Sequence, residues 1–303
     1  MGSSYDACYP AVTELARAGI ASMMLDSAEL LHFRRGMLDA STLLVAVSQS
    51  GESAEVVRLV AALDPENRPL ITSVTNGSAN TLAGLADVSI DTRVGPEVGP
   101  STMTFGAALV GLAAVSATLA GDPVSEVVEN IDARARAAAD AIDRLLASPA
   151  LPDELVSWLG SRQTVVILGR GPARAAAEMG ALTIKEAVGI PVESLQTAQF
   201  RHGPFELAGP ELAAIMIATE AETLEIDLGF AAELTASGAG VLLVTAGAQG
   251  LPGAVHVEIG SLADAIAPAV SIVPIQLLAW RLAAIRGREP GAYYRASKVT
   301  TVE

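Results

Sequence analysis

The chain has 303 residues, of which 51% are hydrophobic, so it is long and apolar enough to bury a large core. Its 19 basic and 34 acidic residues give a formal net charge of −15, which argues against nucleic acid or an anionic membrane as a partner, because both require a basic patch. A single cysteine, Cys8, excludes an internal disulfide and a cysteine-rich zinc site, and agrees with a reducing cytoplasm. His32, His202 and His256 lack metal-ligand spacing, so we expect no metal.

The first residues, MGSSYDACYPAVTEL, show no charged region followed by an apolar segment, so they do not resemble a signal peptide. The small-residue turn at 2–7 is expected to open a helix that runs to about Arg17. The longest mostly apolar stretch, 105–120, is shorter than the ~20 residues that cross a bilayer and predicts a buried helix.

Residues 19–90 alternate apolar strand patterns with helical patterns, which predicts a parallel sheet with helices on both faces and an α/β fold. Ligands on such sheets bind at the carboxyl ends of the strands. The expected elements are a strand at 20–25, a short helix at 27–33, a central strand at 43–47 and further strands at 70–74 and 88–90, the last at an edge.

The loop after the central strand carries three serine hydroxyls around a glycine, in the order Ser48-Gln49-Ser50-Gly51-Glu52-Ser53. A helix is expected at 54–60, and the unpaired N–H groups of its first turn would add further donors, which favours an anion site for a phosphate. The alternative is that the serines only cap the helix. The loop does not match a nucleotide-binding GxxxxGK[ST] motif or a G-x-S-x-G nucleophile elbow.

The second half repeats this outline with a strand at 164–168, a glycine turn and a helix at 173–187. The turn Gly169-Arg170-Gly171 lacks the third glycine of a dinucleotide fingerprint, and Glu193 is poorly placed to bind a ribose, so NAD is disfavoured and a duplicated α/β unit is favoured. Other expected elements are a solvated linking helix at 132–146, strands at 213–218 and 241–244, and an apolar core or interface helix at 272–285.

Three polar residues of the second half are candidates for chemistry: Glu186, His202 and Lys298. Taken singly, each has an ordinary explanation as a surface residue. A carboxylate can, however, abstract a proton next to a carbonyl, a desolvated lysine can form an imine, and an imidazole can move a hydroxyl proton near neutral pH.

Four segments together resemble the sugar isomerase (SIS) domain family, specifically the isomerase half of glucosamine-6-phosphate synthase and its stand-alone deaminase and deglycase relatives. They are SQSGES followed by AEV, GPEVG with Ser101-Thr102, GALTIKEAVGIPVESLQTAQFRHGP and RASKVTTVE, in collinear order over essentially the whole chain. The resemblance implies two tandem SIS units, each a flavodoxin-like three-layer sandwich. We expect them at 1–130 and 157–303, with a helical linker at 131–156.

The resemblance also implies roles for individual residues. Glu186 would carry a proton between C1 and C2, Lys298 would form a Schiff base with a keto sugar, and His202 would assist ring opening in the site of a neighbouring subunit, which implies a homodimer. No cofactor is implied. The sugar phosphate would be held by Ser3, Ser4, Ser48, Gln49, Ser50 and Ser53.

Several departures from the family pattern limit this prediction. Met103 and Thr183 stand where the synthase has lysines, one residue is missing after Gly99, and the family's first strand and the synthase's glutamine-hydrolysing domain are not found in this sequence. We therefore expect a cytoplasmic sugar-phosphate isomerase or aminosugar-phosphate deaminase acting on glucosamine 6-phosphate or a fructose 6-phosphate-like substrate. The alternatives are an aminotransferase-like enzyme that uses separate ammonia, a deglycase, and a sugar-phosphate-binding regulatory module without turnover.

Overall fold

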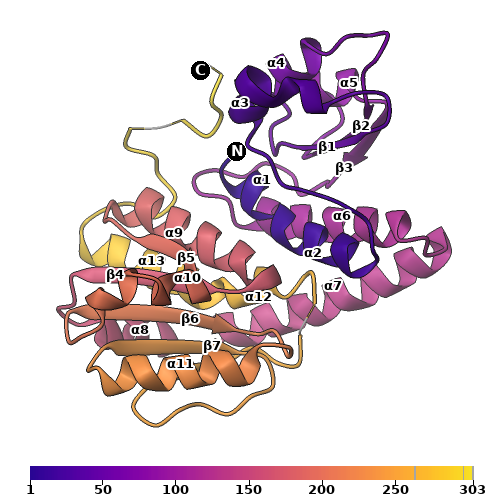
Figure 1. Cartoon of the computed structure of the whole chain (residues 1–303). Helices are drawn as coiled ribbons and strands as arrows, with labels where there is room; N and C mark the ends of the chain where they lie inside the picture. The colour runs from indigo at the N-terminus through magenta and orange to yellow at the C-terminus, as the bar shows by residue number, and fades with distance from the viewer. Residues whose placement is uncertain (263, 296, 302–303) are drawn as a thin grey trace.

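The computed structural model describes residues 1–262, 264–295 and 297–301, so parts of the closing motif RASKVTTVE lie outside the described residues. Two α/β units lie next to each other, one built from the indigo and magenta part of the chain and one from the orange and yellow part (Figure 1). Each contains one parallel sheet, with three strands in the first and five in the second. The predicted α/β fold with two tandem units is confirmed.

The first sheet has the order β1-β2-β3 and confirms three of the predicted strands, with β3 at an edge. Its buried face packs Ala46 and Ile71 against Val56, Val60 and Leu82, so the apolar spacing of helix α4 (Ala54–Ala61) serves this small core. The strands are β1 (Leu43–Val47), β2 (Leu70–Thr75) and β3 (Val88–Asp91).

The strand predicted at 20–25 is wrong, because residues 20–26 form no regular element. Within the described ranges, β1 pairs with β2 on one side and with no strand on the other. In the second sheet, whose order is β5-β4-β6-β7-β8, that place is filled by β4, and β5 pairs with it. A strand at 20–25 would be the counterpart of β5 and has no neighbour to supply its ladder hydrogen bonds.

The second sheet has two strands, β6 and β7, that are buried on both faces, which explains their unbroken apolar sequences. The sequence analysis missed β5 and β8, because each has only four residues, lies at an edge and carries polar residues. The five strands are β4 (Thr164–Gly169), β5 (Glu193–Gln196), β6 (Leu212–Ala218), β7 (Gly240–Thr245) and β8 (Val255–Glu258).

A largely helical layer joins the two sheets into one continuous core. Helices α2 (Cys8–Arg17) and α6 (Met103–Leu119) pack together, and α9 (Arg174–Val188) packs on α13 (Val273–Ile285). Five short helices complete the fold: α1 (Ser3–Asp6), α3 (Ser27–Glu29), α5 (Thr81–Leu85), α10 (Thr197–Arg201) and α12 (Pro268–Ser271). The predicted helices near the start of the chain, after Met103 and after Arg170 are all present.

Helix α7 (Val124–Leu146), the long magenta helix of Figure 1, begins earlier than predicted and is amphipathic rather than fully solvated. Its buried face includes Val127, Ile131 and Leu145 in the common core. Helices α8 (Leu151–Leu159) and α11 (Leu224–Ala236) were not predicted. They complete the helical cover of the second sheet.

One stretch, Pro268–Ile285, is long and apolar enough to cross a membrane by length and composition, with a mean hydropathy of 1.5. It comprises α12 and α13, and 56% of it is buried inside the protein. Helix α13 packs against α8 and α9. The stretch is therefore accounted for as a core helix of the α/β fold, as its apolar circumference predicted.

Candidate active site

A cavity of about 250 Å³ lies where the carboxyl end of β1, the amino terminus of the chain and the carboxyl-terminal tail meet. This is the edge of a parallel sheet at which ligands bind. Seven of the nine predicted site residues line the cavity, and one of them, Glu186, comes from helix α9. The predicted residues in the lining are Ser3, Ser4, Gln49, Ser50, Ser53, Glu186 and, from the tail, Lys298.

The serine loop presents its hydroxyls to this cavity instead of using all of them as helix caps. Ser53 is the N-cap residue of α4, yet its side chain makes no capping hydrogen bond. Ser50 Oγ accepts the Glu52 N–H at 3.1 Å and can still donate its own proton. Gly51 has φ 66°, and a Cβ there would lie 1.9 Å from Asn80 Oδ1, so only glycine fits this turn.

Ser48 lies beneath the loop rather than in the cavity wall. It is 2% exposed, its Oγ accepts the Gly51 N–H at 3.2 Å, and that oxygen lies 3.1 Å from Ser53 Oγ. Ser48 therefore orients Gly51 and Ser53. Of the predicted phosphate-binding serines, it is the one that the described lining of the cavity does not include.

The loop between β6 and α11 in the second unit corresponds to the serine loop of the first unit, but it is acidic. It carries Glu220 and Glu222 where the first unit carries hydroxyls. Burial raises the pKa of Glu220 to about 7, and the neighbouring acids Glu222 and Glu14 act in the same direction. Because carboxylates repel phosphate, only the first of these two loops is built to receive it.

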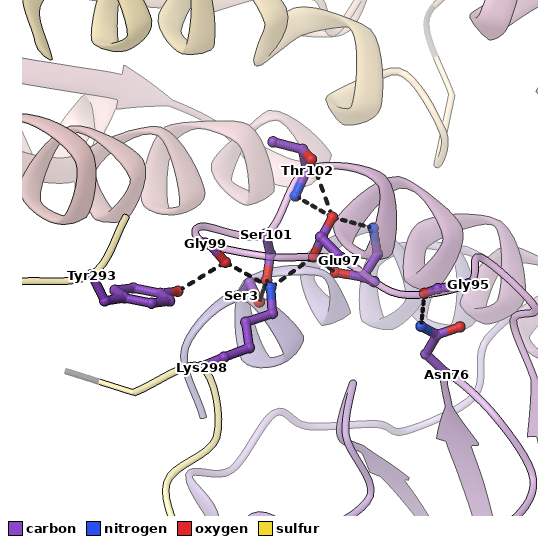
Figure 2. A network of polar contacts seen from close by, with 10 residues as sticks. Ser3, Asn76, Gly95, Glu97, Gly99, Ser101, Thr102, Tyr293 and Lys298 are labelled. Atoms are coloured by element: carbon purple, nitrogen blue, oxygen red, sulfur yellow. Dashed lines mark hydrogen bonds and ion pairs between the residues drawn. The ribbon is translucent and has the colours of Figure 1, made fainter. Parts of the chain in front are cut away.

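Lys298 is held by a polar network on the opposite wall of the cavity (Figure 2). Its Nζ donates to Glu97 Oε2 at 2.7 Å, to the Gly99 carbonyl at 2.8 Å and to Ser101 Oγ at 3.4 Å. The Glu97 side chain is only 3% exposed. Although burial raises its pKa, hydrogen bonds from Lys298, Thr104 and Thr102 prevail and lower the pKa of Glu97 to about 2. Glu97 is therefore a fixed negative charge that positions the ammonium group.

The tail closes over the serine loop from the second unit. Tyr293 Oη donates to the Gly99 carbonyl at 3.1 Å, and the Ala54 N–H of α4 donates to the Thr300 carbonyl at 3.1 Å. Gly99 has φ 77°, and a Cβ there would lie 2.1 Å from Gly291 O, so the tail depends on glycine for this approach. The contacts bring Lys298, which is 201 residues from Glu97 in sequence, into the first unit's site.

Glu186 lies near the end of α9 with its side chain in the cavity lining, whereas the adjacent Lys185 is exposed. Burial raises the pKa of Glu186, and the positive charges of Lys298 and Lys185 oppose this effect. A carboxylate with a raised pKa binds a proton more readily, which suits a group that takes a proton from carbon and returns it. The ordinary explanation, a solvated carboxylate on a surface helix, does not hold.

Three residues that the sequence singled out lie outside the cavity lining. His202 is exposed directly after α10 and does not line the cavity, so the described single chain assembles Glu186 and Lys298 without it. Thr183 is buried within α9, where its Oγ1 donates to the Met179 carbonyl at 2.9 Å. Met103 is 57% exposed at the start of α6. Neither Thr183 nor Met103 is a lining residue of the cavity.

Sequence reasoning missed Glu97, Ser101 and Tyr293 as site residues. Ser101 Oγ accepts the Ser3 hydroxyl proton at 3.0 Å and so connects the two phosphate-side segments. Burial raises the pKa of Tyr293 to about 12, helped by the carboxylates of Glu186 and Glu97. Glu97 lies in the GPEVG segment on which the family resemblance rests, and Ser101 follows that segment by two residues. Tyr293 lies five residues before Lys298, so both parts of the sequence carried a usable signal.

Asp6 is the last residue of helix α1, and it is 9% exposed. Burial raises its pKa from 3.8 to about 7, and the nearby Glu178 carboxylate adds to the shift. The folded state therefore binds a proton here that the unfolded state releases above pH 3.8. Stability from this group is present at low pH and is lost as the pH rises toward 7, by up to about 4 kcal/mol at 1.36 kcal/mol per pKa unit.

We expect Asp6→Asn to raise the free energy of unfolding at pH 8 by about 1–4 kcal/mol and to have little effect at pH 4. Urea denaturation at both pH values measures this. Asp140→Asn, which changes an exposed carboxylate on α7, is the control and should alter neither value. An equal effect of Asp6→Asn at both pH values would refute the assignment.

Within the described residues, no three His, Cys, Asp or Glu side chains gather in a way that could hold a metal ion. The site combines a hydroxyl-rich loop at a helix amino terminus, a carboxylate with raised proton affinity and a positioned lysine, all on a duplicated parallel α/β fold.

The chain belongs to the SIS domain family, whose model matches residues 1–119 and 159–286. It is 30% identical over 309 residues to the isomerizing glutamine–fructose-6-phosphate aminotransferase of Pyrobaculum aerophilum, covering 100% of this chain and 50% of the relative. The chain thus spans about half the length of the curated relatives it matches.

Solved structures agree with the fold. The C-terminal domain of glucosamine-fructose-6-phosphate aminotransferase from Francisella tularensis superposes with a TM-score of 0.84 at 22% identity, over 96% of this chain and 84% of that one. Glucosamine-6-phosphate deaminase from Thermotoga maritima superposes with a TM-score of 0.76 at 20% identity, over 99% and 88% of the two chains. Likeness at this identity establishes the shared fold.

Proposed function

We propose that this protein is an aldose-ketose isomerase or deaminase of phosphorylated sugars, with glucosamine 6-phosphate or a fructose 6-phosphate-like sugar as substrate. The observation that carries the proposal is that the serine loop, Glu186 and Lys298 share one cavity. Hydroxyls and helix N–H groups bind phosphate, and a carboxylate beside an amine can perform enediol or imine chemistry. Such chemistry needs no cofactor.

In this proposal, Ser50, Ser53 and Gln49 bind the phosphate at the amino terminus of α4, and Ser3 and Ser4 add hydroxyls from the other side. Ser48 supports the loop from below. The sugar then extends toward the tail, with C1 and C2 between a carboxylate and an amine. The Ala54 N–H donates to the Thr300 carbonyl and would have to leave it before it could bind the phosphate.

Glu186 would move a proton between C1 and C2, and its raised pKa supports that role. With an aminosugar, that proton shift would leave an imine at C2, and Lys298 would displace ammonia from it to form its own C2 imine. Water would then hydrolyse the lysine imine, which gives the C2 ketone and frees Lys298. His202 would come from a second copy of the chain, which fits its exposure. We therefore propose a homodimer, and a cytoplasmic one in view of the single cysteine.

Three other functions are alternatives to this one. The name of the Pyrobaculum relative supports an isomerizing aminotransferase-like reaction, which in this chain would use separate ammonia. A deglycase that cleaves a sugar-amine adduct is the second alternative. A regulatory module would need only the serine loop for its ligand. The positioning of Lys298 by Glu97, at 2.7 Å, favours an enzyme, because binding of a phosphate gives no reason for a buried carboxylate to hold a lysine there.

Glu186→Gln tests the proposal. We expect the wild type to release fructose 6-phosphate and ammonia from glucosamine 6-phosphate, or to interconvert fructose and glucose 6-phosphates. The variant should lose about 10²–10⁴-fold in kcat, because proton transfer by a positioned side chain contributes that much, and should bind substrate normally. Coupled assays of both products measure the rate, and calorimetry measures binding.

Glu193→Gln, at an exposed glutamate on β5, is the matched control and should keep wild-type activity. Full activity in Glu186→Gln would remove the proton-transfer role. Binding of hexose 6-phosphates by the wild type with no turnover of any of them would instead favour the regulatory module.

A further inference from the structure

The tail that carries Lys298 is attached to the second unit before it reaches the first. It leaves α13 after Ile285, and the Arg288 N–H donates to the Ala283 carbonyl at 2.9 Å, so the first turn of the tail is built on the end of that helix. The yellow chain then passes α9 on its way to the first unit (Figure 1). At this base of the tail, the side chain of Arg288 contacts both α9 and the tail.

The guanidinium group of Arg288 lies against the carboxyl-terminal end of α9. Gly189, the C-cap residue of α9, has φ 73°, and a Cβ there would lie 2.4 Å from Arg288 Nη1, so this approach requires glycine. Arg288 Nη2 donates to the Glu186 carbonyl over 3.5 Å. The last carbonyls of a helix have no partner within the helix and are stabilised by a cation. Arg288 supplies that cation in the turn of α9 that carries Glu186.

The same guanidinium group holds the tail through an aromatic ring. Arg288 Cζ lies 4.3 Å from the centroid of the Tyr294 ring. A guanidinium placed over an aromatic ring is attracted by the negative charge of the ring face. Tyr294 Oη accepts the Glu289 N–H at 2.8 Å, which fixes the ring from its far end. Arg288 therefore has one partner on α9 and one on the tail.

The stacked ring leads directly to the residues that position Lys298. Tyr293, the neighbour of Tyr294 in sequence, donates to the Gly99 carbonyl at 3.1 Å, and Lys298 Nζ donates to the same oxygen at 2.8 Å (Figure 2). One guanidinium group therefore joins the turn of α9 that carries Glu186 to the part of the tail that carries the lysine.

Stability alone does not account for the placement of Arg288. Its Nε is buried and has no hydrogen-bond partner among the described residues, and a buried donor without an acceptor costs free energy. Arg288 is also not among the described lining residues of the active-site cavity, whereas Glu186, Tyr293 and Lys298 are. Any effect of Arg288 on the chemistry must therefore pass through these other residues.

We infer that Arg288 is a positioning residue, which holds Glu186 and Lys298 in a fixed relation to each other across the bound sugar. This inference rests on the proposed function, in which Glu186 moves a proton and Lys298 forms an imine. Both steps require close alignment with the sugar, and a misplacement of about 1 Å can cost about 10²-fold in rate. The serine loop belongs to the first unit, so binding of the phosphate should not depend on Arg288.

Two reactions of fructose 6-phosphate test the inference in Arg288→Met, which keeps an unbranched apolar side chain and removes the guanidinium group. Borohydride trapping at Lys298, followed by mass spectrometry, reports on the tail. Exchange of a C1 proton with heavy water, followed by NMR, reports on Glu186. At saturating sugar we expect both rates to fall by about 10–10²-fold, with the affinity measured by calorimetry unchanged. Arg288→Lys should restore part of both rates, because an ammonium group can still donate to the carbonyl and stack on the ring.

Arg286→Met removes an exposed arginine at the C-cap of α13 and is the matched control, which should keep both wild-type rates. Tyr294→Leu removes the ring and leaves Arg288 on α9. Because Tyr294 is 55% exposed, this variant should fold, and it should slow trapping at Lys298 but leave proton exchange near the wild-type rate.

Wild-type rates in Arg288→Met would overturn the inference and leave the proposed function standing. Slowing of only one reaction in that variant, or a loss of affinity for fructose 6-phosphate in parallel with the rates, would also overturn it. If Arg288→Met does not fold, an unchanged trapping rate in Tyr294→Leu would overturn the inference. A wild type that binds the sugar and performs neither reaction would overturn the proposed function as well.

Discussion

Borohydride added to the protein with fructose 6-phosphate is expected to trap a covalent adduct at Lys298. The tail folds this lysine into the cavity wall, where its side chain is 20% exposed and three oxygens fix its Nζ. Once this ammonium group has lost a proton, the amine is held in position to attack the C2 carbonyl of a bound keto sugar, which favours imine formation. Because the chain has only two lysines, peptide mass spectrometry assigns the adduct without ambiguity.

Lys298→Ala should abolish the adduct and any release of amine, yet keep phosphate-dependent binding. Lys185→Ala is the matched control, since Lys185 lies next to Glu186 on α9 but is exposed, and this variant should be trapped like the wild type. The absence of an adduct with every keto sugar phosphate, together with undiminished amine chemistry in Lys298→Ala, would leave only an enediol route through Glu186.

Replacing Ser50 and Ser53 together by alanine should weaken binding of fructose 6-phosphate at least tenfold and leave the weak binding of free fructose unchanged. Each hydroxyl lost is a hydrogen bond to a charged group, worth about 1.5–3 kcal/mol. Ser53 makes no capping bond to α4, so the stability cost of the double variant is limited to the Ser48 Oγ contact and the Glu52 N–H bond, about 1 kcal/mol each. Titration calorimetry with the two sugars measures the difference.

Ser78→Ala, in the exposed turn after β2, is the control for loss of a nearby hydroxyl and should not change either affinity. Equal losses for the phosphorylated and the free sugar would show that the serine loop contacts the sugar rather than the phosphate. Unchanged affinity for both would place the ligand away from this loop.

The strands with unbroken apolar sequences, and the helices that follow them, could be predicted. The spacing of their apolar residues is visible within each segment of the sequence. The sequence could not show that residues 20–25 form no strand. A strand needs a neighbouring strand for its backbone hydrogen bonds, and the described part of the chain has no strand beside β1 on that side. β5, with the sequence ESLQ, was missed for the opposite reason: pairing with β4 makes it a strand despite its polar residues.

The candidate site also has one part that the sequence could predict and one part that depends on the fold. The serine loop is contiguous in sequence, so its hydroxyls could be recognised together, although the position of Ser48 beneath the loop depends on the turn at Gly51. The pairing of Glu97 with Lys298 joins residues 201 positions apart and depends on how the tail crosses between units. Only the folded chain shows that the lysine predicted to react is held by a buried carboxylate.

The most direct test of a sugar-phosphate site is a crystal structure of the protein with fructose 6-phosphate. We expect density for the phosphate at the amino terminus of α4, within hydrogen-bond distance of Ser50 and Ser53, and the sugar's C2 next to Lys298 Nζ. Density for the phosphate at the acidic loop 219–223 of the second unit, with the serine loop free of ligand, would contradict a sugar-phosphate site at the serine loop.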